Sequence, residues 1–361
     1  MVVYHEIIHI KAPARICLFG DHQDYLGLPV IACAIDRYIE LIAYPSKEKA
    51  LHIHMPDINE ERIINIDDPI IVLSNSDFFA SAIKVLEPFG CIPDRGYDIT
   101  LKGNIPVNAG LSSSSAVLVA WVAFLLEAFG ANETVTPELI AKICYSAEVL
   151  EFNAPGGLMD QYTISLGNTI FLDTVTGKHT TINNEVKSLI IGESGVPKET
   201  LEVLRHLGNF AKTAIKQIKD KFPEFDISKS TMNDYESYSY IIDDNLRPIF
   251  YAALKNYEIT KKAFKVMQLE SIDISLLGEL MDAHHKELKE NLKITVPIID
   301  SMIDGAKGGG ALGAKIVGSG GGGCIVALAE PGNEQSVIEG ILSSGASAAY
   351  KIDIGKGVQV L

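Results

Sequence analysis

Four consecutive serines, Ser112 to Ser115, follow Gly110 and precede a run of apolar residues from Ala116 to Leu126. The first turn of a helix carries unpaired backbone N–H groups and a partial positive charge, so it favours an anion such as phosphate. Serine hydroxyls would add donors to that site, and together with a phosphate they could ligate Mg²⁺. Serine is also a common helix cap. The residues alone therefore support a phosphate cradle and an ordinary helix start about equally, and the chain contains no G-x-x-x-x-G-K-[ST] loop.

A second group of polar side chains lies close together around Gly20, and its members are Arg15, Asp21, His22 and Asp24. Carboxylates accept hydrogen bonds from hydroxyls, so two carboxylates and an imidazole in one turn suit a polyhydroxylated ligand. Asp and Gly are also the residues that form ordinary solvated turns. The turn chemistry by itself favours the solvated turn by about two to one.

Two further carboxylates stand on either side of a Pro-Gly-Gly turn. Glu148 lies within a predicted helix, and Asp160, between Met159 and Gln161, is expected to enter an apolar strand. A carboxylate at such a position is expected to be partly buried, which is costly unless it is paired or functional. The two residues could share a metal ion or divide the roles of metal ligand and base. A surface helix residue and a turn cap are the alternatives, and the sequence favours neither interpretation.

A glycine-rich segment, GAKIVGSGGGGC, extends from Gly313 to Cys324. It matches G-x-G-x-x-G through Gly318, Gly320 and Gly323, which would suggest a nicotinamide-dependent oxidoreductase. The strand-like residues CIVAL follow it, however, where a dinucleotide site requires a helix. The remaining interpretation is a backbone that passes close to another group, because glycine is costly unless a side chain would be in the way.

The elements that would position these residues follow from the hydrophobic pattern. In the first half we expect strands at 1–10, 37–45, 51–55 and 97–103, helices at 77–87, 110–129 and 137–152, and a hairpin at 163–182. In the second half we expect a strand at 187–194, helices at 198–221, 237–265 and 275–291, and a strand pair within 313–328. Separate blocks of sheet and helix favour an α+β fold. The change of character near residue 185 predicts two domains, 1–185 and 186–361. The adjacent His284 and His285 point to different sides of their helix and carry little weight as ligands.

Composition limits the class of protein. Of the 361 residues, 47% are apolar and 21% are charged, so the chain can bury a large core. The formal net charge of −15 argues against nucleic acid and anionic membranes as partners. Five cysteines without a C-x-x-C pattern make disulfides and a zinc site unexpected. The N-terminal residues lack a signal-peptide layout and the longest apolar run is too short to span a bilayer, so we expect a cytoplasmic protein.

Taken in order, these segments resemble the GHMP kinase superfamily, and within it the galactokinase-like sugar 1-kinases. The segment APARICLFGDHQDYLG is similar to the galactokinase signature around G-E-H-x-D-Y, and PVNAGLSSSSA is similar to the phosphate motif P-x-x-x-G-L-x-S-S. The third segment is similar to the C-terminal glycine loop of the family. APGGLMDQY resembles the segment with the catalytic aspartate, and Glu148 precedes it at the spacing of the metal-binding glutamate. Together the motifs span Lys11 to Cys324.

The resemblance implies a phosphotransferase with an alcohol group as acceptor: an ATP-dependent sugar kinase that phosphorylates a monosaccharide at its anomeric 1-hydroxyl, with galactose as the first candidate. The implied fold is a two-domain GHMP kinase fold of the α+β class, with the active site in the interdomain cleft. The triphosphate would lie against the second motif, through Pro106, Gly110, Leu111, Ser112, Ser113, Ser114 and Ser115. Mg²⁺ would be bound by Ser114 and Glu148.

The resemblance also assigns the remaining roles. Asp160 would orient or deprotonate the acceptor hydroxyl, and Arg15 would neutralise charge near the transferred phosphoryl group. The sugar hydroxyls would be held by Asp21, His22 and Asp24. The glycine loop, with Gly318, Gly320, Gly321 and Gly322, would close over the phosphates or the substrate as bare backbone. The region from Ser74 to Phe79 is a candidate for adenine contacts.

Some residues depart from the galactokinase pattern. Asp21 stands where galactokinases usually carry Glu, and Ser319 stands where they carry Ala or Gly. The segment IIGESGVPKET is more similar to mevalonate kinases. A mevalonate-kinase-like enzyme for another small molecule, or a non-catalytic sugar or ATP sensor on the same fold, are therefore the alternatives. Retention of Ser114, Glu148 and Asp160 favours catalysis over a sensor. A monomer or a homodimer is expected.

Overall fold

A computed structural model describes residues 7–361 of the protein, apart from 69–72, 74–76, 185 and 199. The first half of the chain and the C-terminal strand β12 form a sheet with the strand order β12-β1-β2-β5-β3-β4, and a β6-β7 pair is attached to β2. Its strands are β1 (Ile8–Phe19), β2 (Val30–Ser46), β3 (Ala50–Met55), β4 (Glu60–Asn65), β5 (Gly96–Gly103), β6 (Thr169–Leu172), β7 (His179–Ile182) and β12 (Gln359–Val360). All the pairs are antiparallel except that of β3 with β5.

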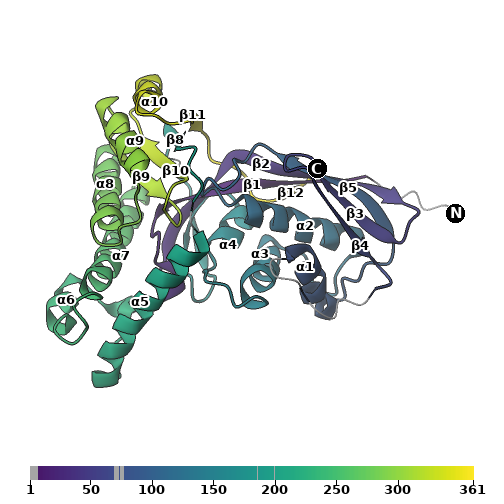
Figure 1. Ribbon diagram of the computed structural model, residues 1–361, viewed down its shortest axis with the longest axis horizontal. Helices are drawn as coiled ribbons and strands as arrows, with labels where there is room; N and C mark the ends of the chain where they lie inside the picture. Colours follow the sequence, from purple (N-terminus) through teal and green to yellow (C-terminus); the bar gives the residue numbers. More distant parts are fainter. Residues whose placement is uncertain (1–6, 69–72, 74–76, 185, 199) are drawn as a thin grey trace.

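Helices cover one face of this sheet (Figure 1). They are α1 (Phe78–Leu86), α2 (Ser113–Phe129), α3 (Pro137–Tyr145), a single π-helical turn (Ser146–Leu150) and α4 (Met159–Leu166). The apolar residues of α2 are the centre of this layer, because the helix packs on β1 and β2 on one side and on α1, α3 and α4 on the other. Trp121 is fully buried there, and its indole N–H donates to the Phe79 carbonyl over 3.1 Å. The apolar run therefore fixes the position of the serine-rich helix start.

A second, four-stranded antiparallel sheet has the order β11-β8-β10-β9. Its strands are β8 (Leu189–Glu193), β9 (Gly313–Val317), β10 (Cys324–Leu328) and β11 (Ala348–Ile352), and the helices of this half are α5 (Thr200–Lys221), α6 (Met232–Tyr238), α7 (Arg247–Met267), α8 (Ile274–Glu290), α9 (Pro297–Gly308) and α10 (Glu334–Ser343). Figure 1 places this group beside the first sheet, with α5 leaning toward α4. Within the described residues, no helix combines the length and the apolarity needed to cross a membrane.

The last strand of the first sheet before the change to the second, β7, ends at Ile182, and the first strand of the second sheet, β8, begins at Leu189. The predicted boundary near residue 185 lies between them. The end of the chain does not stay with the second sheet. Val360 pairs with Ile10, and Ile354 forms a bridge with Ile35 in the first sheet. The division into 1–185 and 186–361 therefore stays a prediction, and the last strand departs from it.

Three sequence-based expectations were wrong in detail. β1 continues through Phe19, so Arg15 lies in a paired strand and not in a turn. Residues 159–166 form helix α4 where we expected a strand, because the apolar side chains there recur with a helical spacing between two glycines. The helix expected over 237–265 is split into α6 and α7, and Pro248 in the first turn of α7 marks its start. Of the strand expected over 1–10, residues 1–6 lie outside the described residues, and β1 begins at Ile8.

We predict that Trp121→Ala lowers the free energy of unfolding by about 3–5 kcal/mol, because it leaves a cavity at the centre of the helical layer and removes the hydrogen bond to Phe79. Chemical denaturation monitored by far-UV circular dichroism would measure it. The control is Val175→Ala, at a side chain that is 71% exposed. A loss in Trp121→Ala no larger than that in the control would contradict this account of the core.

Candidate active site

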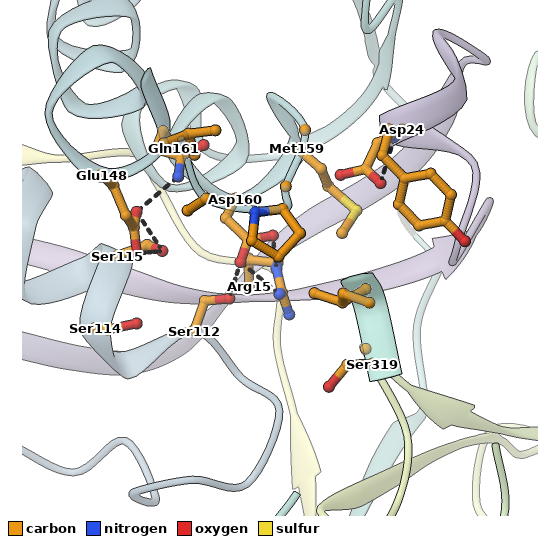
Figure 2. A pocket seen from close by; sticks show the side chains of 18 of the residues that line it. Arg15, Asp24, Ser112, Ser114, Ser115, Glu148, Met159, Asp160, Gln161 and Ser319 are labelled. Carbon is orange, nitrogen blue, oxygen red and sulfur yellow. Dashed lines mark hydrogen bonds and ion pairs between the residues drawn. The ribbon is translucent and has the colours of Figure 1, made fainter. Parts of the chain in front are cut away.

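A cavity of about 550 Å³ lies where the loops of the two sheets meet. Its walls come from β1, from the turn after β1, from the starts of α2 and α4, from the π-helical turn and from the loop after β9 (Figure 2). The predicted residues that line it are Arg15, Asp21, His22, Asp24, Ser112, Ser114, Ser115, Glu148, Asp160 and Gly318. Seven other predicted residues are not among the described residues that line the cavity: Pro106, Gly110, Leu111, Ser113, Gly320, Gly321 and Gly322.

Arg15 and Asp160 form a bidentate ion pair at the floor of the cavity. The Arg15 Nε donates to Asp160 Oδ1 and its Nη2 donates to Oδ2, each over 2.7 Å. The Arg15 Nη1 donates to the Gly110 carbonyl over 2.7 Å. The guanidinium is buried, whereas the Asp160 carboxylate keeps 26% of its side-chain surface exposed. Arg15 is therefore held from two sides, and one edge of the carboxylate faces the cavity.

The electrostatic surroundings keep Asp160 ionised. Burial by itself would raise the pKa of this carboxyl, but the positive charge and the hydrogen bonds of Arg15, followed by the hydrogen bond from Ser112, lower the pKa below its ordinary value. Ser112 donates its hydroxyl to Asp160 Oδ2 from the residue that precedes α2. Its φ of 59° is left-handed, a conformation that is strained for a residue other than glycine. The strained backbone thus places the first hydroxyl of the serine run on Asp160.

The other serines of the run have different surroundings. Ser115 is buried and donates to both oxygens of Glu148, at 3.1 and 2.9 Å, and Gln161 Nε2 donates to Glu148 over 2.6 Å. Glu148 lies in the π-helical turn, a local widening of the helix that is frequent at functional sites. Burial raises the pKa of this carboxyl, and the hydrogen bond from Gln161 opposes that shift. Ser114 is exposed and lies at the cavity wall beside Ser115 (Figure 2).

Asp24 lies on the opposite wall, in a short 3₁₀ turn (Asp24–Leu26). Its carboxylate accepts from the Tyr25 N–H over 2.9 Å and packs against Gly157, where a Cβ atom would clash with it. Burial, and then the negative charge of Asp160, raise the pKa of Asp24 to about 6. The Asp24 carboxyl accepts a single described hydrogen bond from the protein, so its other lone pairs are available to a ligand.

Asp21 and His22 are more engaged with the protein than the sequence suggested. The Gly318 N–H donates to Asp21 Oδ1 over 2.8 Å, and Lys315 Nζ lies 2.7 Å from Oδ2. The His22 Nε2 lies 3.1 Å from the Ser319 carbonyl, and its Nδ1 lies 3.2 Å from the Tyr25 hydroxyl. Both residues line the cavity, but their polar atoms already have protein partners.

The glycine loop approaches backbone rather than an open cavity. A Cβ at Gly320 would lie 2.5 Å from the Ile294 carbonyl oxygen, and one at Gly322 would lie 2.7 Å from that of Val196. The Gly321 N–H donates to the Ile294 carbonyl over 2.8 Å. The expectation that this loop passes close to another group is therefore met by the protein's own backbone, and only Gly318 and Ser319 of the 318–322 segment line the cavity.

Sequence reasoning missed Lys198. This partly buried lysine lies in the loop after β8 and lines the cavity as its second cation beside Arg15. Burial and then the charge of Arg15 lower its pKa, while Asp160 and Glu148 oppose that shift. Nothing in VPKET separates it from a surface lysine. Of the suggested adenine contacts, Phe78 lines the cavity, and Ser74 to Ser76 lie outside the described residues.

Comparisons with known proteins agree with this arrangement. The sequence model for the GHMP kinases N terminal domain matches residues 77–168, that for GHMP kinases C terminal matches 265–347, and the galactokinase galactose-binding signature matches 4–45. The chain is 25% identical to the galactokinase of Fusobacterium nucleatum, over 98% of this chain and 94% of that protein. It is 28% identical to the galactokinase of Thermotoga maritima, over 93% of each chain.

Solved structures share the fold. The Lactococcus lactis galactokinase complexed with galactose matches with a TM-score of 0.89 and 23% identity, over 99% of this chain and 96% of that chain. The Methanococcus jannaschii mevalonate kinase matches with a TM-score of 0.71 and 20% identity, over 99% of this chain and all of that chain. The arrangement of the two sheets and their helices is thus the fold of these kinases.

The raised pKa of Asp24 predicts a pH-dependent cost to stability. Because the folded protein holds this carboxyl at a pKa of about 6, above the ordinary value, folding favours its neutral form. The cost is absent at low pH. It grows as the pH rises from the ordinary pKa of Asp24 in the unfolded chain to its pKa of about 6 in the folded protein. We expect Asp24→Asn to gain stability relative to the wild type by on the order of 2 kcal/mol between about pH 4 and pH 7.

Denaturant titrations of the two proteins across this pH range would measure the difference. The matched control is Asp220→Asn, at an exposed carboxylate on α5. A difference between Asp24→Asn and the wild type that stays constant with pH would mean that Asp24 ionises normally.

Proposed function

Because this chain belongs to the GHMP kinase superfamily, we propose that it is a sugar kinase that transfers the γ-phosphoryl group of ATP to the anomeric 1-hydroxyl of a monosaccharide, with galactose as the first substrate to test. The observation that carries the proposal is the Arg15–Asp160 pair at the floor of a cavity with the serine-rich start of α2 on one wall and Asp24 on the other. The wall formed by the start of α2 suits phosphate, and the wall that carries Asp24 suits the hydroxyl groups of a sugar.

The ATP phosphates would lie against the start of α2. Backbone N–H groups there are free of partners within the helix, and the helix dipole favours negative charge. Among the described residues, Arg15 and Lys198 are the lysine and arginine side chains that line the cavity, and they would oppose the charge that spreads over the transferred group in the transition state. The galactokinase relatives support ATP as the donor.

The residues present fit a magnesium ion. Within the described residues, no three His, Cys, Asp or Glu side chains cluster as a self-sufficient metal site. Glu148 and the exposed Ser114 hydroxyl are oxygen ligands of the kind that Mg²⁺ prefers, and Mg²⁺ commonly takes its other ligands from phosphate and water. We propose that these two residues hold it, with Ser115 and Gln161 orienting the Glu148 carboxylate. The ion would neutralise phosphate charge.

Asp160 would orient the acceptor hydroxyl. Its Oδ2 accepts from Arg15 and Ser112, whereas Oδ1 accepts from Arg15 only, so Oδ1 has a free lone pair for the hydroxyl. A pKa held below its ordinary value makes Asp160 a weak base before transfer. In the step, the acceptor oxygen forms a bond to γ-phosphorus, the bond from γ-phosphorus to the bridging oxygen of ADP breaks, and the proton passes to Asp160. Such late proton transfer suits a loose transition state.

The sugar would lie between Asp160 and Asp24. Asp24 accepts one described hydrogen bond, from a backbone N–H, and its remaining lone pairs are available to sugar hydroxyls. An anionic Asp24 would accept more strongly than a neutral one, so sugar binding is expected to weaken below about pH 6. A mevalonate-kinase-like activity and a non-catalytic sensor remain the alternatives to test.

The direct test is ADP release from Mg-ATP in the presence of a panel of acceptors: galactose, glucuronate, galacturonate, arabinose, mannose, fucose, heptoses, N-acetylhexosamines and mevalonate. We expect a sugar to be turned over, and ³¹P and ¹³C NMR of the product to place the phosphate on C1. Turnover of mevalonate in preference to every sugar would overturn the assignment. Binding of ATP and a sugar without turnover would support the sensor.

We predict that Asp160→Asn lowers kcat by about 10²–10⁴-fold, because an amide can neither accept the proton nor balance the charge of Arg15. Nucleotide affinity, measured by calorimetry, should change little. Asp220→Asn is the control for the loss of one carboxylate at an exposed site. Turnover of Asp160→Asn close to that of the wild type would remove Asp160 from the mechanism.

We also predict that Glu148→Gln and Ser114→Ala raise the Mg²⁺ concentration needed for half-maximal activity, by about tenfold or more for Glu148→Gln. The matched control is Ser343→Ala, at an exposed serine at the end of α10 that does not line the cavity. Metal titrations at saturating ATP would measure the shift. An unchanged magnesium dependence in both variants would place the ligands elsewhere.

A further inference from the structure

A fully buried ion pair joins the two sheets beside the cavity. Lys315 Nζ, from β9 of the second sheet, lies 2.7 Å from Asp21 Oδ2, in the turn that follows β1 of the first sheet. The two side chains are 0% and 1% exposed. Removing both charges from water is expensive, and such a pair is maintained only if its geometry and additional hydrogen bonds compensate. Here Lys315 also donates to the Cys17 carbonyl over 3.0 Å.

The same pair is connected to two residues that line the cavity. The second oxygen of Asp21 accepts from the Gly318 N–H over 2.8 Å. The next residue in each segment continues the contact, because His22 Nε2 lies 3.1 Å from the Ser319 carbonyl and must donate to it. The turn after β1 is thus fastened by three contacts to β9 and to the turn that follows it. The first turn leads directly into Asp24.

The neighbouring His284 is unable to replace the charge of Lys315. His284, from α8, packs beside this pair and stacks on Phe19 with ring centroids 6.1 Å apart. Burial, and then the charge of Lys315, lower the pKa of His284 to about 3, so its ring is neutral at physiological pH. Burial would raise the pKa of Asp21, and the charge of Lys315 is the largest influence that lowers it. The ionised state of Asp21 therefore depends chiefly on Lys315.

We propose that Lys315 is a positioning residue for the sugar site, and that Asp21 acts as its partner in fastening the two turns and does not itself bind the sugar. The proposal rests on the proposed sugar kinase activity. It assigns direct recognition to Asp24, whose carboxylate is less engaged. It also gives the aspartate at position 21 a physical role: its two oxygens accept from Gly318 and pair with Lys315 behind the cavity wall.

The test compares Lys315→Met, Asp21→Asn and the double variant D21N/K315M with the wild type. We expect each single variant to raise the KM for the sugar by about tenfold or more while the KM for ATP changes by less than about threefold. The double variant should show no more than the larger single effect, because both changes break one unit. A lower folded fraction would reduce the apparent kcat and leave the KM unchanged.

Additional variants guard against failure to fold. Lys315→Arg keeps the charge and should restore most of the sugar KM. The double variant leaves no unpaired buried charge, so it should recover stability relative to either single variant while its sugar KM stays high. Lys307→Met is the matched control, since it breaks an ion pair with Asp282 in which both side chains are more than a third exposed. A sugar KM of the double variant equal to that of the wild type would mean that the Asp21–Lys315 pair contributes to stability only, and it would overturn the proposed positioning role.

Two further measurements separate the possible outcomes. If Asp21 bound the sugar directly, Asp21→Asn would raise the sugar KM and would erase discrimination against one deoxy-sugar, because the hydroxyl at that position would lose its carboxylate partner. That result would overturn the proposal. Hydrogen exchange of residues 17–24 and 313–323 requires no activity, and we expect faster exchange in both segments in Lys315→Met. Unchanged exchange would refute the fastening itself, whereas absence of sugar turnover in the wild type would refute the proposed function only.

Discussion

The bidentate pair of Arg15 with Asp160 is the interaction on which the rest of the site depends. A buried guanidinium is tolerated only when its donors are satisfied, and here Asp160 and the Gly110 carbonyl accept from it. These partners come from α4 and from the loop before α2, whereas Arg15 lies in β1. One side chain therefore fixes three segments relative to one another. It also lowers the pKa of Asp160, so that position and charge have the same cause.

The two sheets meet through backbone contacts that only glycine allows. A Cβ at Gly110 would lie 3.0 Å from the Val317 carbonyl oxygen, and one at Gly323 would lie 2.8 Å from that of Ala109. Both residues have positive φ, of 91° and 81°. The loop before α2 and the glycine loop are thereby packed against each other without intervening side chains. The glycines bring the walls of one cavity together from opposite ends of the sequence.

Three carboxylates around this cavity differ in pKa because their neighbours differ. Asp160 faces a guanidinium and is held ionised, whereas burial raises the pKa of both Asp24 and Glu148. Asp24 has one described protein donor, and Glu148 accepts from two side chains that fix its orientation. Residues of the same chemical type are in this way suited to the three different tasks that we propose for them: orienting an acceptor, accepting from hydroxyls and ligating a cation.

Local patterns and motifs with fixed spacing in the sequence were enough to predict the α+β class, the serine-rich helix start and ten of the residues that line the cavity. The sequence by itself did not determine that α4 is a helix, that Lys198 lines the cavity, or that Asp21 pairs with Lys315. Short apolar runs fit helix and strand alike, and a lone lysine has no local signature. The pairing of Asp21 with Lys315 joins residues nearly three hundred positions apart, and only the packing of one sheet against the other decides which buried charges meet.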